Sequence, residues 1–258
     1  MVETVFHDTL LFQFSGLSEA AGLVHAVSSR PWNLAPHRGP DAHLAVERRK
    51  ALCSHLGISF DRLTAPEQVH GAEVVALDRS EIGAGGHGRQ HAVRYVDGLI
   101  TDEPDVGIVI LSADCPMILV YDEAGPVLGA AHASWRGTVA GITPHLVRSM
   151  AKQYGCKPER LVAGICPSAG PCCYEIGPEV ARIVAQRFDD PGRYLPVRND
   201  RLTLDLWQAN FDQLVAVGVR PDRIERADLC SICDERFFSH RREGEGTGRT
   251  ALIAAIRP

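Results

Sequence analysis

Three residues carry side chains that bind transition metals. His70, Cys115 and His132 each stand at the end of a short apolar run, beside small residues or glycine. Two imidazole nitrogens and one thiolate form the donor set of a zinc site with three protein ligands, which leaves a fourth position open for water or substrate. An open position is typical of catalysis rather than of structural crosslinking. Because the three residues are far apart in the sequence, the prediction depends on a fold that brings them together.

Asp114 and Pro116 flank Cys115 at a predicted break between two strands. Proline has no N–H group to donate, so Pro116 ends the first strand and leaves Cys115 able to point into a cleft. Asp114 has two interpretations, and the sequence leaves both open. Its carboxylate could accept a hydrogen bond from a ligand histidine or from substrate, or it could cap the turn.

A helix is expected to begin soon after His132, within the segment Ser134–Thr138. The first turn of a helix presents free N–H groups and a partial positive charge. Arg136 lies in this turn and adds a planar guanidinium with several donors. We therefore expect a phosphate or carboxylate group to bind there, and a structural salt bridge is the alternative role of Arg136.

Five of the eight cysteines form a second group of possible ligands. Cys230 and Cys233 make a Cys-x-x-Cys pair, which is typical of half a zinc ribbon or of a redox pair. Cys166, Cys172 and Cys173 could supply the other half. Adjacent side chains diverge on a strand, however, so the Cys172–Cys173 pair argues against a closed site of four thiolates, and the role of the five stays open.

Short apolar runs of strand length recur along the chain, and several are continuous, as expected for strands covered on both faces. The predicted strands are Thr9–Phe14, Gly22–Ala26, Arg62–Val69, Val74–Leu77, Val106–Leu111, Met117–Tyr121, Val127–Ala131, Leu161–Ile165, Leu202–Leu204 and Thr250–Ile256. Apolar residues at helical spacing predict helices over Asp41–Leu56, Thr138–Gln153, Pro178–Phe188 and Leu206–Val217. Because strands and helices do not alternate strictly, one mixed α/β domain spanning 1–258 is favoured over a doubly wound parallel sheet.

Composition and charge exclude several classes of partner. The chain has 258 residues, of which 45% are hydrophobic, enough for a sizeable core. With a formal net charge of −5 and no run of Lys or Arg, nucleic acid is not expected as a partner. The basic residues Arg236, His240, Arg241 and Arg242 suit one anionic small molecule instead. Without a signal peptide or an apolar stretch of about eighteen residues, we expect no membrane contact and a cytoplasmic location with free thiols.

Six sequence segments together make the chain similar to a known family. They are Gln68–Val74, Asp97–Thr101, Ala113–Pro116, Ala131–Gly137, Gly170–Glu175 and Gly248–Ala251. From about Gly22 to the C-terminus, the chain resembles the YfiH-like family, also called the multicopper polyphenol oxidase (laccase) family. Members of this family have been described as purine nucleoside phosphorylases and as peptidoglycan editing factors.

The resemblance implies a mixed α/β fold of YfiH-like architecture, also compared with cysteine-hydrolase-like toxins, and a zinc or copper site. The family's metal ligands would map onto His70, Cys115 and His132. The arginine of its Asn-Arg helix motif would map onto Arg48, and Glu47 replaces the asparagine here. Its Thr-Arg-x-Gly-Gly-x-Ser loop is present only as residues 28–34, without the glycine pair. The implied activities are phosphorolysis of adenosine, inosine and methylthioadenosine, and deamination of adenosine.

The leading hypothesis is a purine nucleoside enzyme that uses Zn²⁺, with Cu²⁺ as the alternative ion. For deamination, a metal lowers the pKa of bound water towards about 7, and Asp114 could transfer the proton. For phosphorolysis, Arg48, Arg136 and the helix N-terminus would hold phosphate against the ribose. The expected partners are a nucleoside and phosphate, and the chain is expected to be a monomer or a weak homo-oligomer.

Three other functions use the same residues differently. Without metal, Cys115 could be a nucleophile and His132 or His70 its base, in a hydrolase or a peptidoglycan editing factor acting on cell-wall precursors. Copper-dependent oxidation of polyphenols is the second alternative. It is less favoured, because two histidines and one thiolate are few ligands for redox copper and no axial methionine is evident. A metal sensor or scaffold, which would turn over no nucleoside, is the third.

Overall fold

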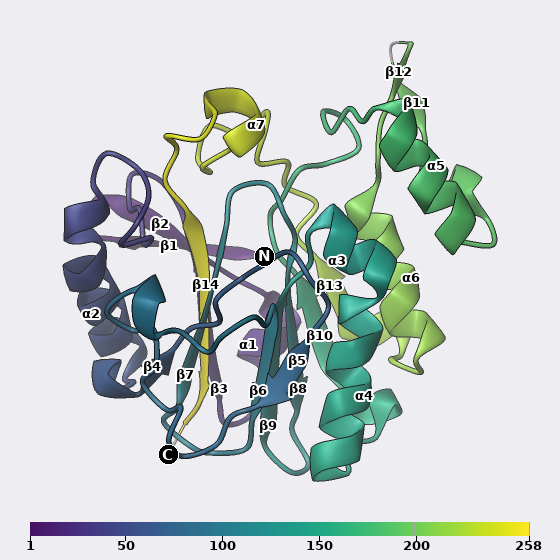
Figure 1. Cartoon of the computed structure of the whole chain (residues 1–258). Helices are drawn as coiled ribbons and strands as arrows, with labels where there is room; N and C mark the ends of the chain where they lie inside the picture. Colours follow the sequence, from purple (N-terminus) through teal and green to yellow (C-terminus); the bar gives the residue numbers. More distant parts are fainter. Residues whose placement is uncertain (199, 258) are drawn as a thin grey trace.

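Two six-stranded mixed sheets form the centre of the molecule, and helices lie on either side of them (Figure 1). The structure is a computed structural model that describes residues 1–198 and 200–257. β14 lies inside the first sheet and pairs antiparallel with β3 on one side and with β7 on the other. The strand order of this sheet is β1 (Val2–Phe6), β2 (Thr9–Gln13), β3 (Leu23–Ser28), β14 (Thr250–Ile256), β7 (Gly107–Ser112) and β4 (Leu63–Thr64).

The second sheet has β8 and β9 at its centre, paired antiparallel from Met117–His132 to Asp122–Val127. Its strand order is β13 (Ile224–Arg226), β10 (Val162–Ile165), β8 (Met117–Asp122), β9 (Val127–His132), β6 (Gly98–Thr101) and β5 (Val74–Ala76). A separate small hairpin pairs β11 (Val197–Arg198) with β12 (Arg201–Leu202). The chain passes from the first sheet to the second between β7 and β8, which places residues 113–116 at the junction of the two sheets.

Helices pack on the outer faces of both sheets, on opposite sides of the view in Figure 1. α2 (Ala45–Leu56) covers the first sheet, and α4 (Ile142–Tyr154) and α6 (Leu206–Ala216) cover the second. The other helices are α1 (Ser15–Ser18), α3 (Trp135–Ala140), α5 (Pro178–Arg187) and α7 (His240–Glu243). Short 3-10 turns occupy Ala42–Leu44, Phe60–Arg62, Arg89–His91, Pro158–Arg160, Pro191–Arg193 and Pro221–Arg223.

A large apolar core fills the space between the two sheets. Phe12 and Val27 reach it from the first sheet, Leu119 and Leu128 reach it from the second, and all four are fully buried. With helices outside and this core inside, the central strands have both faces covered, which explains their continuous apolar sequences. The layer order of helix, sheet, sheet and helix confirms the predicted mixed α/β class.

The predicted strand over 62–69 is mostly irregular. Only Leu63–Thr64 pairs within the sheet, and Pro66 makes one isolated bridge. Pro66 has no N–H group with which to continue a ladder, and the N–H of His70 donates to the Asp97 carboxylate instead of to a strand. The prediction that His70 ends a strand is therefore wrong, because His70 lies in a turn with φ of 62°.

The predicted helix over Thr138–Gln153 is two helices, α3 and α4, which are separated at Gly141. Gly141 has φ of 87°, a left-handed conformation that glycine adopts without steric cost, and it closes α3 as a C-cap. The apolar residues of the predicted helix continue at helical spacing across this break, so the periodicity alone does not reveal it. Trp135 and Arg136 therefore lie on the short α3, near the end of β9, and not on the axis of α4.

A helix that spans a bilayer needs about 20 consecutive, mostly apolar residues. None of the helices formed by residues 1–198 and 200–257 is both long enough and apolar enough to cross a membrane.

Substitution of Gly164 on β10 tests how closely the core between the sheets is packed. A Cβ at this position would lie 2.5 to 2.8 Å from three ring atoms of Phe14, so we expect Gly164→Ala to lower the free energy of unfolding by about 1–3 kcal/mol. Gly125, in the turn between β8 and β9, has nothing within 4 Å of such a Cβ, and Gly125→Ala is the matched control. Urea unfolding with a fixed m-value measures both. Equal midpoints for the two variants would contradict this description of the core.

Candidate metal and substrate site

The structure brings together the three donors that the sequence predicts. One ligand atom each of His70, Cys115 and His132 lies within 4.8 Å of the other two, close enough for a single ion to contact all three. His70 comes from the turn before β5, Cys115 from the junction of β7 and β8, and His132 from the end of β9. The burial decreases from His132, which is buried, through Cys115 to His70, which is exposed. One side of the donor set therefore faces solvent and the cavity.

The carboxylate of Asp97, which is fully buried, positions both histidines. It lies 2.8 Å from His132 Nδ1, and it accepts hydrogen bonds from the backbone N–H groups of Val69, His70 and Gly71 at 2.7 to 3.1 Å. An ionised carboxylate can only accept, so Nδ1 of His132 carries the proton and Nε2 is free as a metal donor. A carboxylate behind a ligand histidine is the usual arrangement in zinc sites.

The backbone of Asp97 adds two further connections to the same site. Its carbonyl oxygen accepts from the N–H of His132 at 2.8 Å, and its own N–H donates to the carbonyl of Glu73 at 3.0 Å. Gly98 follows at the start of β6, where an added Cβ would lie 2.8 Å from Val74 Cγ2. There is thus no room for a side chain at Gly98, and the side chain of Asp97 before it organises the site. Asp97 lies in one of the six segments that carry the family resemblance, but the sequence alone indicated no role for it.

Charges within the donor set favour an ionised thiol. Burial alone would raise the pKa of Cys115, but the charges and hydrogen bonds of His132 and His70 outweigh burial and lower it. Burial likewise opposes protonation of His132, but Cys115 and the hydrogen bond to Asp97 raise its pKa. The pKa of Asp97 is also lowered despite its burial, because His132 and the backbone N–H groups stabilise its charge. A thiolate is the form of cysteine that binds metal ions or attacks carbon.

A cavity of about 500 Å³ adjoins the three donors. Trp135 and Tyr174 give it aromatic surface, and Gln68 is held at its wall by a pair of hydrogen bonds to the backbone of Leu111. Among the described residues, the arginines that line it are Arg38, Arg49, Arg89, Arg136, Arg241 and Arg249. A volume of this size fits a small organic ligand, and the arginines indicate that the ligand is anionic.

Asp114 lines the same cavity next to Cys115. Its Oδ1 accepts from Ser231 Oγ and its Oδ2 accepts from the backbone N–H of Arg241, both at 2.7 Å. The φ of Asp114 is 98°, and its carbonyl oxygen accepts from the N–H of Ala169 at 2.7 Å. Asp114 therefore fixes the junction of the two sheets to the loops that follow β10 and β13.

The structure places the two predicted substrate arginines differently. Arg136 lines the cavity with its guanidinium 4.3 Å from the ring centroid of Trp135. Arg48 contacts the carbonyl of Asn33 and lies 3.6 Å from Asp41. Among the described residues that line the cavity, Arg49 is present and Arg48 is not. Arg49 is also the more buried of the two, and its side chain donates to three backbone carbonyl oxygens.

The start of α3 is less available to an anion than the sequence suggests. Ser134 is the N-cap, and its Oγ accepts the N–H of Gly137 at 3.1 Å, which removes one of the free donors of the first turn. The helix has only six residues, so its macrodipole is small. Arginine side chains, rather than the helix end, supply most of the positive charge near the donors.

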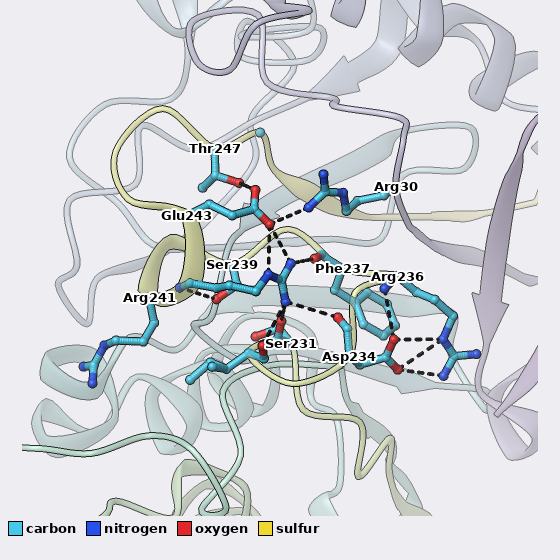
Figure 2. Close-up of polar contacts among 12 residues, drawn as sticks. Arg30, Ser231, Asp234, Arg236, Phe237, Ser239, Arg241, Glu243 and Thr247 are labelled. Atoms are coloured by element: carbon cyan, nitrogen blue, oxygen red, sulfur yellow. Dashed lines mark hydrogen bonds and ion pairs between the residues drawn. The ribbon is translucent and has the colours of Figure 1, made fainter.

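The basic residues near α7 have separate roles, and Figure 2 shows the contacts of Arg236 with Asp234 and the direction of Arg241. Arg236 pairs with Asp234 at 2.7 Å and with Glu3 at 2.8 Å, and Arg242 donates to backbone carbonyls and to Glu243. Arg241 points away from this network and lines the cavity. The network holds α7 in place, and Arg241 and His240 are the members of the group that reach the cavity.

The fold and the site define a class of protein: two packed sheets that support a set of two histidines and one cysteine beside a cationic cavity. The chain belongs to the family described as multi-copper polyphenol oxidoreductase laccase, which matches residues 17–257. This confirms the resemblance found in the sequence.

Relatives with assigned activities cover most of the chain. It is 37% identical over 230 residues to the purine nucleoside phosphorylase YlmD of Geobacillus stearothermophilus, covering 87% of this chain and 83% of that one. It is 34% identical over 223 residues to the adenosine deaminase RL5 of an unknown prokaryotic organism, covering 84% of each. The crystal structure of YlmD from Geobacillus stearothermophilus matches with a TM-score of 0.88 at 32% identity, over 97% of this chain and 96% of that chain. The Bacillus licheniformis hypothetical protein YfiH matches with a TM-score of 0.87 at 25% identity, over 96% of each.

Asp97→Asn tests the position of Asp97 behind the donors. Asparagine keeps the shape but loses the charge and one acceptor oxygen, so we expect zinc affinity to fall about 10- to 100-fold. Competition with a chromophoric chelator measures the affinity, and thermal unfolding verifies that the variant is folded. Asp102→Asn, at an exposed acidic residue after β6, is the matched control. Equal zinc affinity for Asp97→Asn and the parent protein would show that Asp97 does not orient the donors.

Proposed function

We propose that this chain is a purine nucleoside enzyme that uses Zn²⁺, catalysing phosphorolysis of adenosine, inosine and methylthioadenosine and deamination of adenosine. The observation that carries the proposal is the convergence of His70, Cys115 and His132 beside a cavity lined by arginines. Relatives named as purine nucleoside phosphorylases and as an adenosine deaminase support the same two reactions.

The donor set fits Zn²⁺. Three donors within 4.8 Å of one another need to move inward only slightly to bind one ion at zinc–ligand distances of about 2.0–2.3 Å. His132 has the carboxylate partner that ligand histidines require, and Cys115 has a lowered pKa that favours the thiolate. Zn²⁺ bound there would supply Lewis acidity at the wall of the cavity.

Copper fits the same residues less well. A copper site with two histidines and one cysteine ordinarily adds a weak axial ligand such as methionine or glutamine. Among the described residues that line the cavity there is no methionine, and both polar atoms of the Gln68 side chain are engaged by the backbone of Leu111. We therefore propose Zn²⁺ as the resident ion and Cu²⁺ as the alternative.

The arginines of the cavity suit phosphate because their charge is available. Arg49, Arg241 and Arg249 donate to backbone carbonyl oxygens, which carry no net charge. In the part of the chain that the structure describes, none of these three forms an ion pair with a carboxylate. Arg89, by contrast, lies 3.5 Å from Glu67. An anion in the cavity therefore meets guanidinium groups whose positive charge is not already neutralised.

For phosphorolysis, these arginines would hold phosphate against C1′ of the ribose. A phosphate oxygen forms the new bond to C1′ while the bond from C1′ to the purine nitrogen breaks, and that nitrogen takes up a proton. Arg136 and Arg241 would contribute by orienting the phosphate and stabilising charge as the bond breaks. Trp135 and Tyr174 offer flat surface against which the purine can pack.

For deamination, water adds at C6 of adenine and ammonia leaves, so a proton must move from the water to the departing amine. Asp114 would perform this transfer, as the sequence suggested. Each of its carboxylate oxygens accepts one hydrogen bond in the structure and retains a second lone pair for the proton. Ser231 and the N–H of Arg241 would keep the carboxylate beside Cys115 during the transfer.

Product analysis of zinc-loaded protein tests the proposal. With adenosine and phosphate we expect adenine and ribose 1-phosphate, together with inosine from deamination. Cys115→Ala should lose the zinc of this site and both products, because the site then retains only two donors. Cys156→Ser, at a buried cysteine remote from the donors, should keep full activity. The absence of both inosine and ribose 1-phosphate from zinc-loaded parent protein would reject the proposal.

Arg136→Ala tests the phosphate contact. Loss of one charged hydrogen-bond donor removes about 1.5–3 kcal/mol of binding, so we expect KM for phosphate to rise at least about tenfold, with a smaller change in KM for adenosine. Initial-rate kinetics with each substrate varied separately measure both constants. Arg148→Ala, on the exposed face of α4, is the matched control. A change in the adenosine constant alone would assign Arg136 to the nucleoside instead.

A second candidate function is a metal-free hydrolase that uses Cys115 as nucleophile. The lowered pKa of Cys115 and the raised pKa of His132 favour it, because a thiolate beside a protonated imidazole is the resting state of many cysteine nucleophiles. Such an enzyme, or an editing factor acting on cell-wall precursors, would contain no zinc at the site of Cys115 and would be alkylated rapidly at that residue. Stoichiometric zinc that protects Cys115 from alkylation supports the nucleoside enzyme over this alternative.

A further inference from the structure

Four cysteines outside the cavity form a second cluster of donors. The Sγ atoms of Cys172, Cys173, Cys230 and Cys233 all lie within 4.8 Å of one another, and Cys172 Sγ is 3.9 Å from Cys233 Sγ. Zinc–sulfur bonds of about 2.3 Å in a tetrahedron place two sulfur atoms about 3.8 Å apart. Sulfur atoms of a disulfide are about 2.05 Å apart. The distance between Cys172 and Cys233 is therefore that of two ligands of one ion, and the other two sulfur atoms lie close enough to complete such a set.

The backbone explains how two adjacent cysteines point to the same place. Cys172 and Cys173 lie in a turn after β10, where the N–H groups of Cys173 and Tyr174 both donate to the carbonyl of Gly170, at 3.0 and 2.9 Å. Adjacent side chains diverge on a strand, but they need not diverge in a turn. The sequence-based argument against a closed site of four thiolates is therefore wrong. Cys166, the other candidate, is fully buried in the apolar core between the sheets.

Cys230 and Cys233 lie in a second turn, after β13. The N–H of Gly170 donates to Cys230 Sγ at 3.2 Å. Gly170 can approach Cys230 closely because it has no side chain. An added Cβ would lie only 3.1 Å from Cys230 Cβ. Backbone donors around a thiolate are what a metal-bound cysteine needs.

The surroundings also suit a negatively charged centre. Four thiolates around a divalent ion carry a net charge of −2. Arg198 and Arg201 line the hollow that contains Cys172 and Cys173. Arg198 beside the cluster would offset part of that charge, whereas Arg201 already pairs with Glu175 of the same hollow at 3.1 Å. The exposed positions of Cys172 and Cys233 give an ion a path from solvent.

We propose that Cys172, Cys173, Cys230 and Cys233 bind one Zn²⁺ in a closed structural site, separate from the site of His70, Cys115 and His132. Each cysteine loses its thiol proton on binding, so four protons are released and no group is oxidised or reduced. Four thiolates without an open position define a structural rather than a catalytic zinc site. The proposal is independent of the reaction that the cavity catalyses.

The zinc would join two loops that build the wall of the cavity. Ser231, inside the Cys230–Cys233 turn, donates to Asp114 at 2.7 Å. Tyr174, next to Cys173, lines the cavity. Joining the loop after β10 to the loop after β13 fixes both residues relative to Cys115. Ser231 is thus a positioning residue that depends on the structural zinc.

Metal analysis of the full-length protein, purified without chelators and without a histidine tag, tests the proposal. We expect the double variant Cys115→Ala/His132→Ala to retain one zinc per chain, because it keeps all four clustered cysteines. Zinc-edge X-ray absorption of this variant should show four sulfur neighbours at about 2.3 Å and no nitrogen. Adding Cys173→Ser and Cys233→Ser should remove this zinc, and Cys156→Ser should not.

The absorption spectrum decides the question even where the cysteine variants fail to fold, because it is recorded on a protein with an intact cluster. Hydrogen exchange provides the structural readout: removal of zinc with a chelator should increase exchange in residues 170–175 and 230–234. Disulfide bonds among the four cysteines in place of metal, or one iron per chain in place of zinc, would overturn the proposal. Nitrogen neighbours in the spectrum would overturn it as well.

Discussion

The buried carboxylate of Asp97 is the interaction on which the donor site depends. Transfer of a charge from water to a protein interior is strongly unfavourable unless hydrogen bonds replace the lost hydration. Three backbone N–H groups and the ring of His132 provide these bonds. The N–H groups belong to the turn of His70. The hydrogen bonds that stabilise the charge of Asp97 therefore also hold the ring of His132 and the backbone of His70 in place. A loop that would otherwise be free to move becomes part of a rigid site.

The two sheets supply the third donor through the junction between β7 and β8. Cys115 lies where the chain leaves one sheet and enters the other, so its position is set by the packing of the core between them. Protein interiors pack as densely as organic crystals, and small shifts there are costly. His132 is the last residue of β9, which pairs directly with β8. Its partner is Met117, the first residue of β8, which directly follows Pro116 in the sequence. The distance between the sulfur of Cys115 and the nitrogen of His132 is therefore a property of the sheet rather than of flexible side chains.

The sequence points to residues whose side-chain chemistry is distinctive, whereas it does not reveal features that depend on geometry. The types of His70, Cys115 and His132 suffice to suggest a metal site, whereas a single aspartate such as Asp97 looks like any turn residue. Arg49 could have been preferred to Arg48, because the buried positions 45, 49, 52 and 53 follow one face of α2 at helical spacing and Arg48 lies off that face. The turn that lets Cys172 and Cys173 converge could not be predicted, since it depends on a carbonyl of Gly170 accepting two N–H groups.

The distribution of charge separates the cavity from the rest of the surface. The chain has a formal net charge of −5, and surface arginines such as Arg193 and Arg220 are paired with aspartates at short distances. Arginines of the cavity such as Arg49 and Arg249 are instead held by backbone carbonyls, which orient a guanidinium without neutralising it. Field lines from such groups are concentrated in a hollow with low-dielectric walls. An acidic protein can in this way attract an anionic substrate to the cavity, because the positive charge of these arginines is left uncompensated there.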